Sequence, residues 1–448
     1  KRLPLKSGDV LNHGDYETAK NALRNEALAR GYFDYSFSAH RIEVNTDEHW
    51  ADVDLVLASG PRYRLGPVRF SKTPFDDDLL QRLVPYKAGA PYSADTVASL
   101  NGRLNNSGYF RDVRVRTLRD QASDHTIPVQ VDATARQPNT VATGLGFSTD
   151  EGPRVRLSWD KHWVNSRGHQ IFSDIQVSRV QRNITSRYVI PLRDPINDRL
   201  QFQAGLQSED IQDTRSRKLT VGVQRQQEFP SGWTRTQSLQ LLREDYTQAD
   251  ESDQATLLMP GLSFSRTRAR GGLDPYWGDR QSYGVDIADD HLLSTVSMAR
   301  ATLSNKWLRT FGERNRVSIR LDAGAIETSD FSGVPSSLRF FAGGDQSVRG
   351  YAYQSLAPED ADGKLVGGRY LLTGSIQYGY RFLPNWRAAV FTDAGNAFNS
   401  FTVPDYKVGS GFGLHWLSPV GPVRVDFAWA VSEPGTPFRL HISLGSPL

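Results

Sequence analysis

Few side chains in this sequence stand at spacings that support catalysis or metal binding. Its nine histidines show neither the His-x-x-x-His nor the Glu-x-x-His spacing of a metal site, and the chain has no cysteine. Ser347 and Ser418 lack the Gly-x-Ser-x-Gly context of a nucleophile elbow. Gly144 and Gly146 do not open a phosphate loop, because no helix follows them. The sequence therefore predicts a protein that is not an enzyme and has no metal or cofactor.

Arg349 and Asp393 are candidates for an ion pair that holds a loop against a strand. Arg349 lies in the segment Phe340–Tyr351 (FFAGGDQSVRGY), inside a predicted long loop of about residues 328–368. A guanidinium offers five donors in a planar fork, so it can fix a loop to an acceptor in a polar interior. Asp393 on a later predicted strand is the candidate acceptor, and we expect it to point inward while Phe391 faces outward. The alternative is that Arg349 is one solvated loop arginine among many.

Strands must position these residues, because apolar and polar residues alternate from Val141 to the C-terminus. Period two identifies strands but does not say which face meets lipid. We count about 16 segments, which fits the even strand numbers of bacterial outer-membrane barrels. The polar face is rich in Arg, Gln and Gly, and aromatic residues gather near strand ends. We predict an all-β transmembrane barrel of antiparallel strands over residues 137–448, with a large soluble β-domain as the alternative.

Composition supports folded domains and excludes some functions. The chain has 448 residues, of which 38% are hydrophobic and 23% charged. No apolar run is long enough for a transmembrane helix. The formal charge of +3 gives little support for nucleic-acid binding. Lys1 is preceded by no initiator Met or apolar signal region, so we expect any export signal to have been removed or left out.

The first third of the chain combines helical and strand periods. Predicted helices at residues 15–30 and 93–108 are each followed by Gly-Tyr-Phe, at positions 31 and 108, which lie 77 apart and predict a tandem repeat. The second copy reads as strand, helix, helix, strand, strand, and the first lacks the opening strand and helix. We therefore expect an incomplete α+β domain at residues 1–60 and a complete one at residues 61–136.

The segment Phe340–Tyr351 and the segment Phe391–Gly395 (FTDAG) resemble the superfamily of outer-membrane assembly and secretion barrels that carry POTRA domains. In that superfamily an Arg-Gly-aromatic motif lies on a long sixth extracellular loop folded into the barrel lumen, and the repeats resemble POTRA domains. The sequence departs from the superfamily at Gln377, where Glu is common, which leaves Asp393 as the better partner for the loop arginine. The resemblance implies a loop-anchor motif of Val348, Arg349, Gly350, Tyr351, Asp393 and Gly395.

Within this superfamily the sequence is most similar to the TamA family, the barrel subunits of translocation and assembly modules, which are related to BamA. Residues 60–63, 340–358 and 444–448 carry that likeness. It implies a bacterial outer-membrane insertase or translocase with POTRA domains in the periplasm. The implied partners are a TamB-type periplasm-spanning protein, client outer-membrane proteins and autotransporters, and outer-membrane lipid, with lipid transport as a further role. The alternatives are a general barrel-assembly or two-partner secretion barrel of the same superfamily, and a passive solute channel.

The seam between the first and last strands is predicted to be the weakest strand pair and to open laterally for clients. The first strand, residues 141–148, carries two glycines that offer no side chain for cross-strand packing. The last strand, residues 438–445, is short, and Pro447 cannot donate a ladder hydrogen bond. The predicted seam residues are Val141, Gly144, Gly146, Phe438, Leu440, Ile442 and Leu444.

Overall fold

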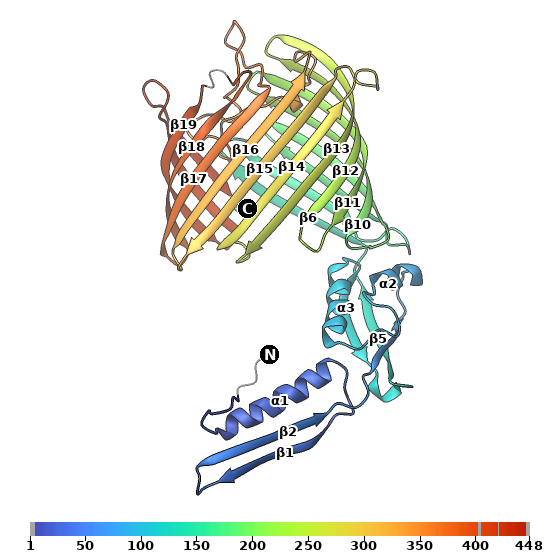
Figure 1. Ribbon diagram of the computed structural model, residues 1–448. Coiled ribbons are helices and arrows are strands. Elements are labelled where there is room, and N and C mark those ends of the chain that lie inside the picture. Colours follow the sequence, from blue (N-terminus) through green and yellow to red (C-terminus); the bar gives the residue numbers. More distant parts are fainter. Residues whose placement is uncertain (1–4, 402–404, 420, 445–448) are drawn as a thin grey trace. The chain divides into compact units, whose positions relative to one another are not determined.

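The computed structural model describes residues 5–401, 405–419 and 421–444 and divides into two compact units (Figure 1). The first unit runs to Pro138 and includes the turns His162–His169 and Arg193–Ile196. The second unit holds Asn139–Lys161, Gln170–Leu192 and the chain from Asn197 onward. No helix within the described ranges is both long and apolar enough to cross a membrane.

The first unit begins with α1 (His13–Ala29) and the antiparallel pair β1 (Ser36–Asn45) and β2 (Trp50–Ala58). Asn12 caps α1, since its Oδ1 accepts a hydrogen bond of 2.8 Å from the Gly14 N–H. Three side chains on one face of this helix are buried, namely Tyr16, Ala19 and Ala27.

A second group of elements in this unit builds a three-stranded sheet covered by helices. Its central strand β5 (Thr126–Ala135) pairs in parallel with β3 (Arg64–Phe70) and antiparallel with β4 (Phe110–Thr117). The helices α2 (Asp77–Leu83) and α3 (Ala94–Asn106) supply apolar side chains at helical spacing, and a short 3₁₀ turn, η1 (Arg119–Gln121), joins β4 to β5. The fully buried core contains Leu79, Leu83, Leu100, Leu104, Ile127, Val129 and Val131.

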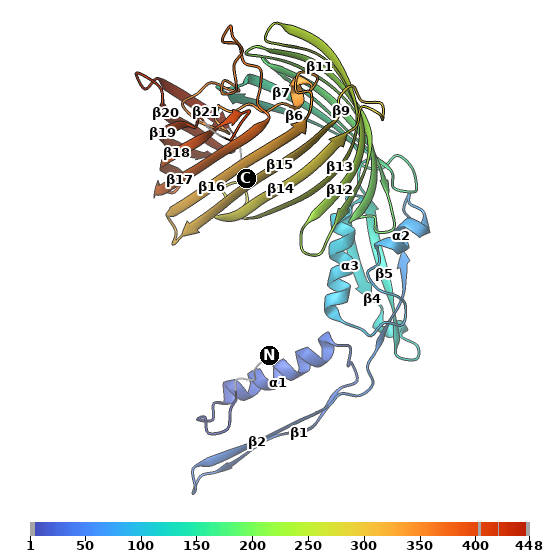
Figure 2. The same cartoon turned by 45° about the horizontal axis from the view of Figure 1, so that its top comes forward.

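The second unit is a closed antiparallel barrel of 16 strands, β6 to β21 (Figures 1 and 2). This confirms the predicted fold. Figure 2 shows β12 to β20 as one continuous curved wall. The strands are β6 (Asn139–Ser148), β7 (Gly152–Lys161), β8 (Gln170–Ser178), β9 (Gln181–Pro191), β10 (Asp198–Ile211), β11 (Thr214–Glu228), β12 (Thr234–Gln248), β13 (Glu251–Arg270), β14 (Trp277–Ala288), β15 (Met298–Phe311), β16 (Asn315–Thr328), β17 (Tyr370–Leu383), β18 (Trp386–Phe398), β19 (Lys407–Ser418), β20 (Gly421–Ala430) and β21 (Phe438–Leu444).

Apolar side chains cover the outer face of this barrel. On β10, Phe202 and Leu206 are 47% and 55% exposed, whereas the neighbouring Gln201 is 4% exposed. A soluble β-sandwich has the reverse arrangement, with its apolar residues facing inward. The alternation therefore presents an apolar surface to lipid and a polar surface to the lumen.

Residues 329–369 connect β16 to β17 and are called the long loop below. They form the sixth connection at the rim opposite to the start of β6, and they contain the 3₁₀ turn η2 (Ser336–Leu338). Both sides of the lumen receive contacts from the loop: Arg349 bonds to Asp393 of β18, and the side-chain amide of Gln354 donates to Glu209 of β10. The long loop thus lies inside the barrel, as predicted.

Candidate functional site

The long loop brings Arg349 against Asp393. Nε of Arg349 donates to Oδ2 of Asp393 at 2.7 Å, and Nη2 donates to Oδ1 at 2.9 Å. The backbone N–H of Arg349 donates to Oδ2 as well, at 3.0 Å. Arg349 is 5% exposed and Asp393 is fully buried. A two-pronged, charge-assisted contact of this kind fixes both the position and the orientation of the loop backbone.

Two further side chains complete the acceptor set around this guanidinium. Nη1 of Arg349 donates to Oδ2 of Asp426 on β20 at 3.0 Å and to Oε1 of Gln377 on β17 at 2.9 Å. Gln377 therefore still accepts a hydrogen bond where the superfamily commonly has Glu, and Asp426 supplies the second carboxylate. Sequence reasoning missed Asp426. Its alternation with Val425 and Phe427 placed it on the polar face, but several acidic residues share that property.

Phe391 lies on the lumenal face, which corrects the expectation that it points outward. Residues two apart on a strand share a face, so Phe391 must lie on the same side as Asp393. The ring is 5% exposed, and the guanidinium carbon of Arg349 lies 3.4 Å from its centroid. The aromatic face thus adds a cation–π contact to the ion pairs.

The rest of the predicted motif packs against β19 to β21. Gly350 has φ of +98°, and a Cβ there would lie 3.0 Å from the backbone N of Ala430. Gly409 of β19, which sequence reasoning missed, lets the loop approach closely, because a Cβ at this position would overlap the carbonyl of Arg349. Nearby, Val348 is fully buried and the Tyr351 hydroxyl lies 2.7 Å from that of Ser432. Gly395 is not part of these contacts. A Cβ at this position of β18 would collide with the carbonyl of Leu372 on β17.

A buried histidine links the loop motif to both strands that flank the seam. Nε2 of His441 on β21 accepts a hydrogen bond of 3.0 Å from the Gly350 N–H. Its Nδ1 lies 3.7 Å from Oδ1 of Asp150, in the turn between β6 and β7. Oδ2 of Asp150 accepts a hydrogen bond of 2.6 Å from the Asp345 N–H. The contacts of Asp150, Asp345, Gly350 and His441 are called the clasp below.

Two carboxyl groups meet in this clasp. Burial raises the pKa of Asp345 to about 6, and the charge of the neighbouring Asp150 adds to the rise. Burial opposes ionisation of Asp150 too, but the nearby His441 imidazole and the hydrogen bond from the Asp345 N–H hold the pKa of Asp150 below its usual range. The pair therefore keeps a proton on Asp345 under mildly acidic conditions.

The seam itself has little backbone pairing in the described residues. All seven residues of β21 have a partner on β20, whereas Ser443 alone has one on β6, namely Ser148. Two further hydrogen bonds join Thr149 to Ile442, at 3.1 and 3.2 Å. The residues predicted for the seam lie on its two strands, Val141, Gly144 and Gly146 on β6 and Phe438, Leu440, Ile442 and Leu444 on β21, and the one register pair across the seam in the described residues joins two others. Gly445 and Pro447 lie outside the described residues.

Comparison with known families and proteins identifies the superfamily. The model of the Omp85 superfamily domain matches residues 129–446, and that of the POTRA family, described as surface antigen variable number repeat, matches residues 1–60 and 63–135. The chain belongs to the Omp85 superfamily.

Curated relatives of this Omp85 chain include two proteins named outer membrane protein assembly factor BamA. The one from Nitratidesulfovibrio vulgaris is 22% identical over 443 residues, which cover 91% of this chain and 54% of the relative. The one from Neorickettsia risticii is 21% identical over 473 residues, which cover 97% of this chain and 61% of the relative. The chain therefore spans little more than half the length of these relatives.

Solved structures show the same fold. BamA from Haemophilus ducreyi lacking POTRA domains 1-3 matches with a TM-score of 0.81 at 16% identity, covering 99% of this chain and 95% of that one. CdiB from Acinetobacter baumannii matches with a TM-score of 0.59 at 12% identity, covering 96% and 81% of the two chains. The likeness in fold is thus greater to that BamA than to this CdiB.

Family membership places this Omp85 barrel in the bacterial outer membrane with its POTRA domains in the periplasm, as predicted. The matched relatives are named assembly factors, and neither matched family is an enzyme family.

The long loop of this Omp85 barrel has a second tether, which the sequence did not reveal. Glu244 of β12 is fully buried and accepts hydrogen bonds from Ser336 Oγ at 2.9 Å and from the Ser337 N–H at 3.0 Å. Ser216 Oγ of β11 donates to the same carboxylate at 2.9 Å. No motif singles out Glu244 among the other charged residues of its strand, so only the path of the loop identifies it.

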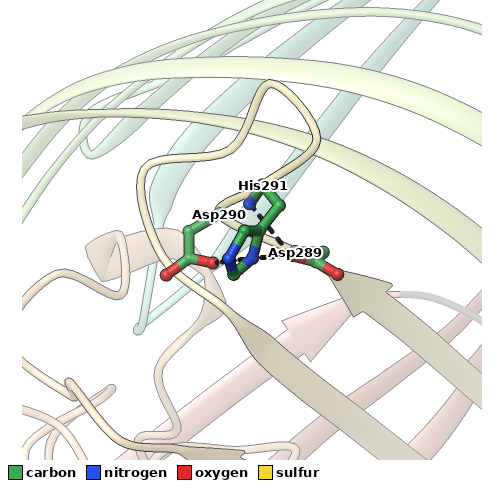
Figure 3. A group of neighbouring side chains, drawn as sticks. All are labelled: Asp289, Asp290 and His291. Carbon is green, nitrogen blue, oxygen red and sulfur yellow. Dashed lines mark hydrogen bonds and ion pairs between the residues drawn. The ribbon is translucent and has the colours of Figure 1, made fainter.

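One group of side chains has donors suited to a metal ion. Asp289, Asp290 and His291 lie within 4.8 Å of one another between β14 and β15, and Figure 3 shows the imidazole between the two carboxylates. All three are exposed, and Nδ1 of His291 lies 2.9 Å from each carboxylate. These contacts satisfy the group internally, so we assign no metal to it.

Proposed function

We propose that this chain is an outer-membrane insertase or translocase subunit that helps client outer-membrane proteins, including autotransporters, enter the membrane through the seam between β6 and β21. The observation that carries the proposal is the contrast between β21 and its two neighbours, since among the described residues one register pair joins it to β6 and seven join it to β20. Over residues 438–444, opening the barrel at β6 therefore disrupts fewer ladder pairs than opening it between β20 and β21.

Strand edges supply the driving force in this mechanism. Separation of β6 from β21 exposes rows of N–H and C=O groups, which template pairing with another chain. A client hairpin that pairs with these edges gains ladder hydrogen bonds, and its apolar residues gain contact with lipid. No hydrolysis is required. The loop anchor at Arg349 keeps the long loop in the lumen while the neighbouring seam opens.

The periplasmic part has the matching role of receiving extended segments. In this proposal residues 61–136 form a complete POTRA domain, residues 1–60 contribute a helix and two strands of another, and residues 137–448 form the barrel. The outer edge of β3 is partly covered, because Leu65 exchanges backbone hydrogen bonds with Gly89 and Ala90. The edge strand β4 is therefore the better site for an added strand, whether from a client or from a TamB-type partner. Handling of outer-membrane lipid is a further role of such a module.

A disulfide across the seam tests the proposal directly. The chain lacks cysteine, so Ser148→Cys with Ser443→Cys introduces one defined pair at the register contact. Oxidation should abolish client insertion by the barrel in liposomes, and reductant should restore it. The matched control is Ser173→Cys with Ser186→Cys across β8 and β9, where the two hydroxyl oxygens lie 2.9 Å apart. Insertion at the normal rate through a locked seam would reject lateral opening.

A second candidate is a general barrel-assembly or two-partner secretion barrel of the same superfamily. The fold likeness to BamA from Haemophilus ducreyi and to CdiB from Acinetobacter baumannii supports it. A pull-down of the full-length barrel from membranes distinguishes these functions by the proteins that it recovers. Many unrelated barrel precursors indicate general assembly, one dedicated secreted partner indicates secretion, and autotransporters with a TamB-type protein indicate the TamA function.

A further inference from the structure

A lumenal cavity beside the tip of the long loop is lined by many basic side chains, and the proposed function assigns most of them no role. The cavity has a volume of about 60 Å³ and is lined by residues of β15 to β20 and of the loop. That volume accommodates several water molecules or one small ion, at roughly 10–15 Å³ per water. Six cationic side chains line it: Lys306, Arg316, Arg320, Arg349, Arg387 and Arg424.

Four of these cations have carboxylate partners. Arg316 and Arg387 both contact Asp274, the second at 3.1 Å. Arg320 lies 3.3 Å from Asp322. Arg349 has the two partners already described. Lys306 and Arg424 make no hydrogen bond or ion pair with any residue in the described parts of the chain, so both basic side chains are left without a partner.

Some N–H groups of these arginines are also unsatisfied. Nε of Arg316, of Arg387 and of Arg424 is buried without a hydrogen-bond partner among the described residues. Buried N–H groups need acceptors, because each unmade hydrogen bond costs about 1–3 kcal/mol. Water supplies acceptors but no charge, whereas an anion with several oxygens supplies both.

We propose that this cavity binds a phosphate group, either as free inorganic phosphate or as the phosphate of a lipid headgroup. Guanidinium forks match the oxygens of a tetrahedral oxyanion, and Lys306 adds a point charge. Asp345 and Gln346 of the long loop also line the cavity. A phosphate bound to Lys306 and Arg424 would therefore join β15 and β20 next to the loop tip and hold the loop in place.

Thermal unfolding of the full chain in detergent micelles tests this site. Tryptophan fluorescence is followed with inorganic phosphate at constant ionic strength, with chloride as the replaced anion. We expect phosphate to raise Tm, because a ligand that binds the folded state stabilises it. Lys306→Gln and Arg424→Gln should each weaken phosphate binding about tenfold or more, as loss of a charged hydrogen bond does. Lys218→Gln is the control, a β11 cation that does not line this cavity.

A second arm distinguishes the two sources of phosphate. Dihexanoyl phosphatidate, a short-chain lipid with a phosphate headgroup, replaces inorganic phosphate in the same titration. A rise in Tm with inorganic phosphate alone identifies a free-anion site, and a rise with the phosphatidate identifies a headgroup site. No rise with either probe, or a rise that both substitutions leave unchanged, overturns the proposal.

The wild-type chain provides a measurement that does not depend on folding of the variants. The ³¹P resonance of inorganic phosphate should broaden when the protein is added and sharpen again when sulfate competes for the site. A linewidth that the protein does not change at millimolar phosphate overturns the proposal for the free anion. The phosphatidate titration of the wild-type chain then decides for the headgroup.

Discussion

The loop anchor and the seam lie on the same barrel and are built in opposite ways. Arg349 is buried and donates to Asp393, Asp426 and Gln377, which lie on three different strands. In the part of the chain that the structure describes, the seam joins β21 to β6 through one register pair and two hydrogen bonds to Thr149. Dense polar contacts thus hold the loop, whereas few contacts among the described residues hold the two strands that we propose to separate.

The clasp at His441 connects the two regions. It ties the loop motif to β21 through Gly350 and to the β6–β7 turn through Asp150. Side-chain contacts from the loop therefore supplement the sparse backbone ladder of the seam. If the seam opens as proposed, these side-chain contacts have to break together with the backbone pairing.

Removal of the anchor should have the largest effect. Arg349→Ala leaves Asp393 buried without its guanidinium and leaves Asp426 with His415 alone, and breaking a buried pair in this way costs about 3–5 kcal/mol. We expect a matching loss in the free energy of unfolding, measured in micelles with urea. Arg215→Ala is the control, because Arg215 is 74% exposed in its pair with Asp210 and should change stability by less than about 1 kcal/mol. Equal effects of the two substitutions would show that the buried contacts of Arg349 do not anchor the loop.

The carboxyl pair of the clasp should make stability depend on pH. The pKa of Asp345 is raised to about 6 from an ordinary 3.8, so the folded state retains a proton that the unfolded state releases. Stability should therefore fall as pH rises from 4 through 6, by about 2–3 kcal/mol at most. Asp345→Asn should remove most of this pH dependence of the free energy of unfolding, which urea unfolding at a series of pH values measures. A variant with the same pH dependence as the wild type would show that Asp345 does not titrate there.

Loss of the buried histidine should loosen the seam more than it destabilises the barrel. His441→Phe leaves the Gly350 N–H without its acceptor, which costs about 1–3 kcal/mol. Hydrogen–deuterium exchange should speed up at Gly350 and in β21, with little change in β12 to β14. His291→Phe, on an exposed loop, serves as the control. Uniform acceleration across the barrel would indicate a general loss of stability instead.

The smallest change should come from the seam itself. Thr149→Val removes the side-chain acceptor of the Ile442 N–H and nothing else from the ladder. We expect a cost of about 0.5–1.5 kcal/mol in local opening, seen as faster amide exchange at Ile442. Thr220→Val, within the fully paired strand β11, is the control. Slower exchange at Ile442 would contradict the idea that this contact helps to close the seam.

Several features could be predicted from the sequence because they depend on local periodicity. Alternation over residues such as Leu200 to Leu206 predicted strands, and the even number of segments predicted a barrel of about 16 strands. The phrase that contains Arg349 and the segment that contains Asp393 indicated the two ends of the anchor. The parity of Phe391 was predicted wrongly, although period two alone requires it to share a face with Asp393.

Other contacts were decided by tertiary structure alone. Asp426 meets Arg349 from 77 positions away, and Glu244 meets Ser336 from 92 positions away. Asp345 meets Asp150 across 195 positions. Strand alternation determines which residues share a face, but barrel closure and the path of the long loop determine which of them touch. The sequence by itself thus determined the strands and the two alternating sets of residues along each, and its resemblance to the superfamily indicated the anchor motif. Only the closed barrel determined the clasp, the second tether and the cationic cavity, because each joins residues whose separation along the chain carries no periodic signal.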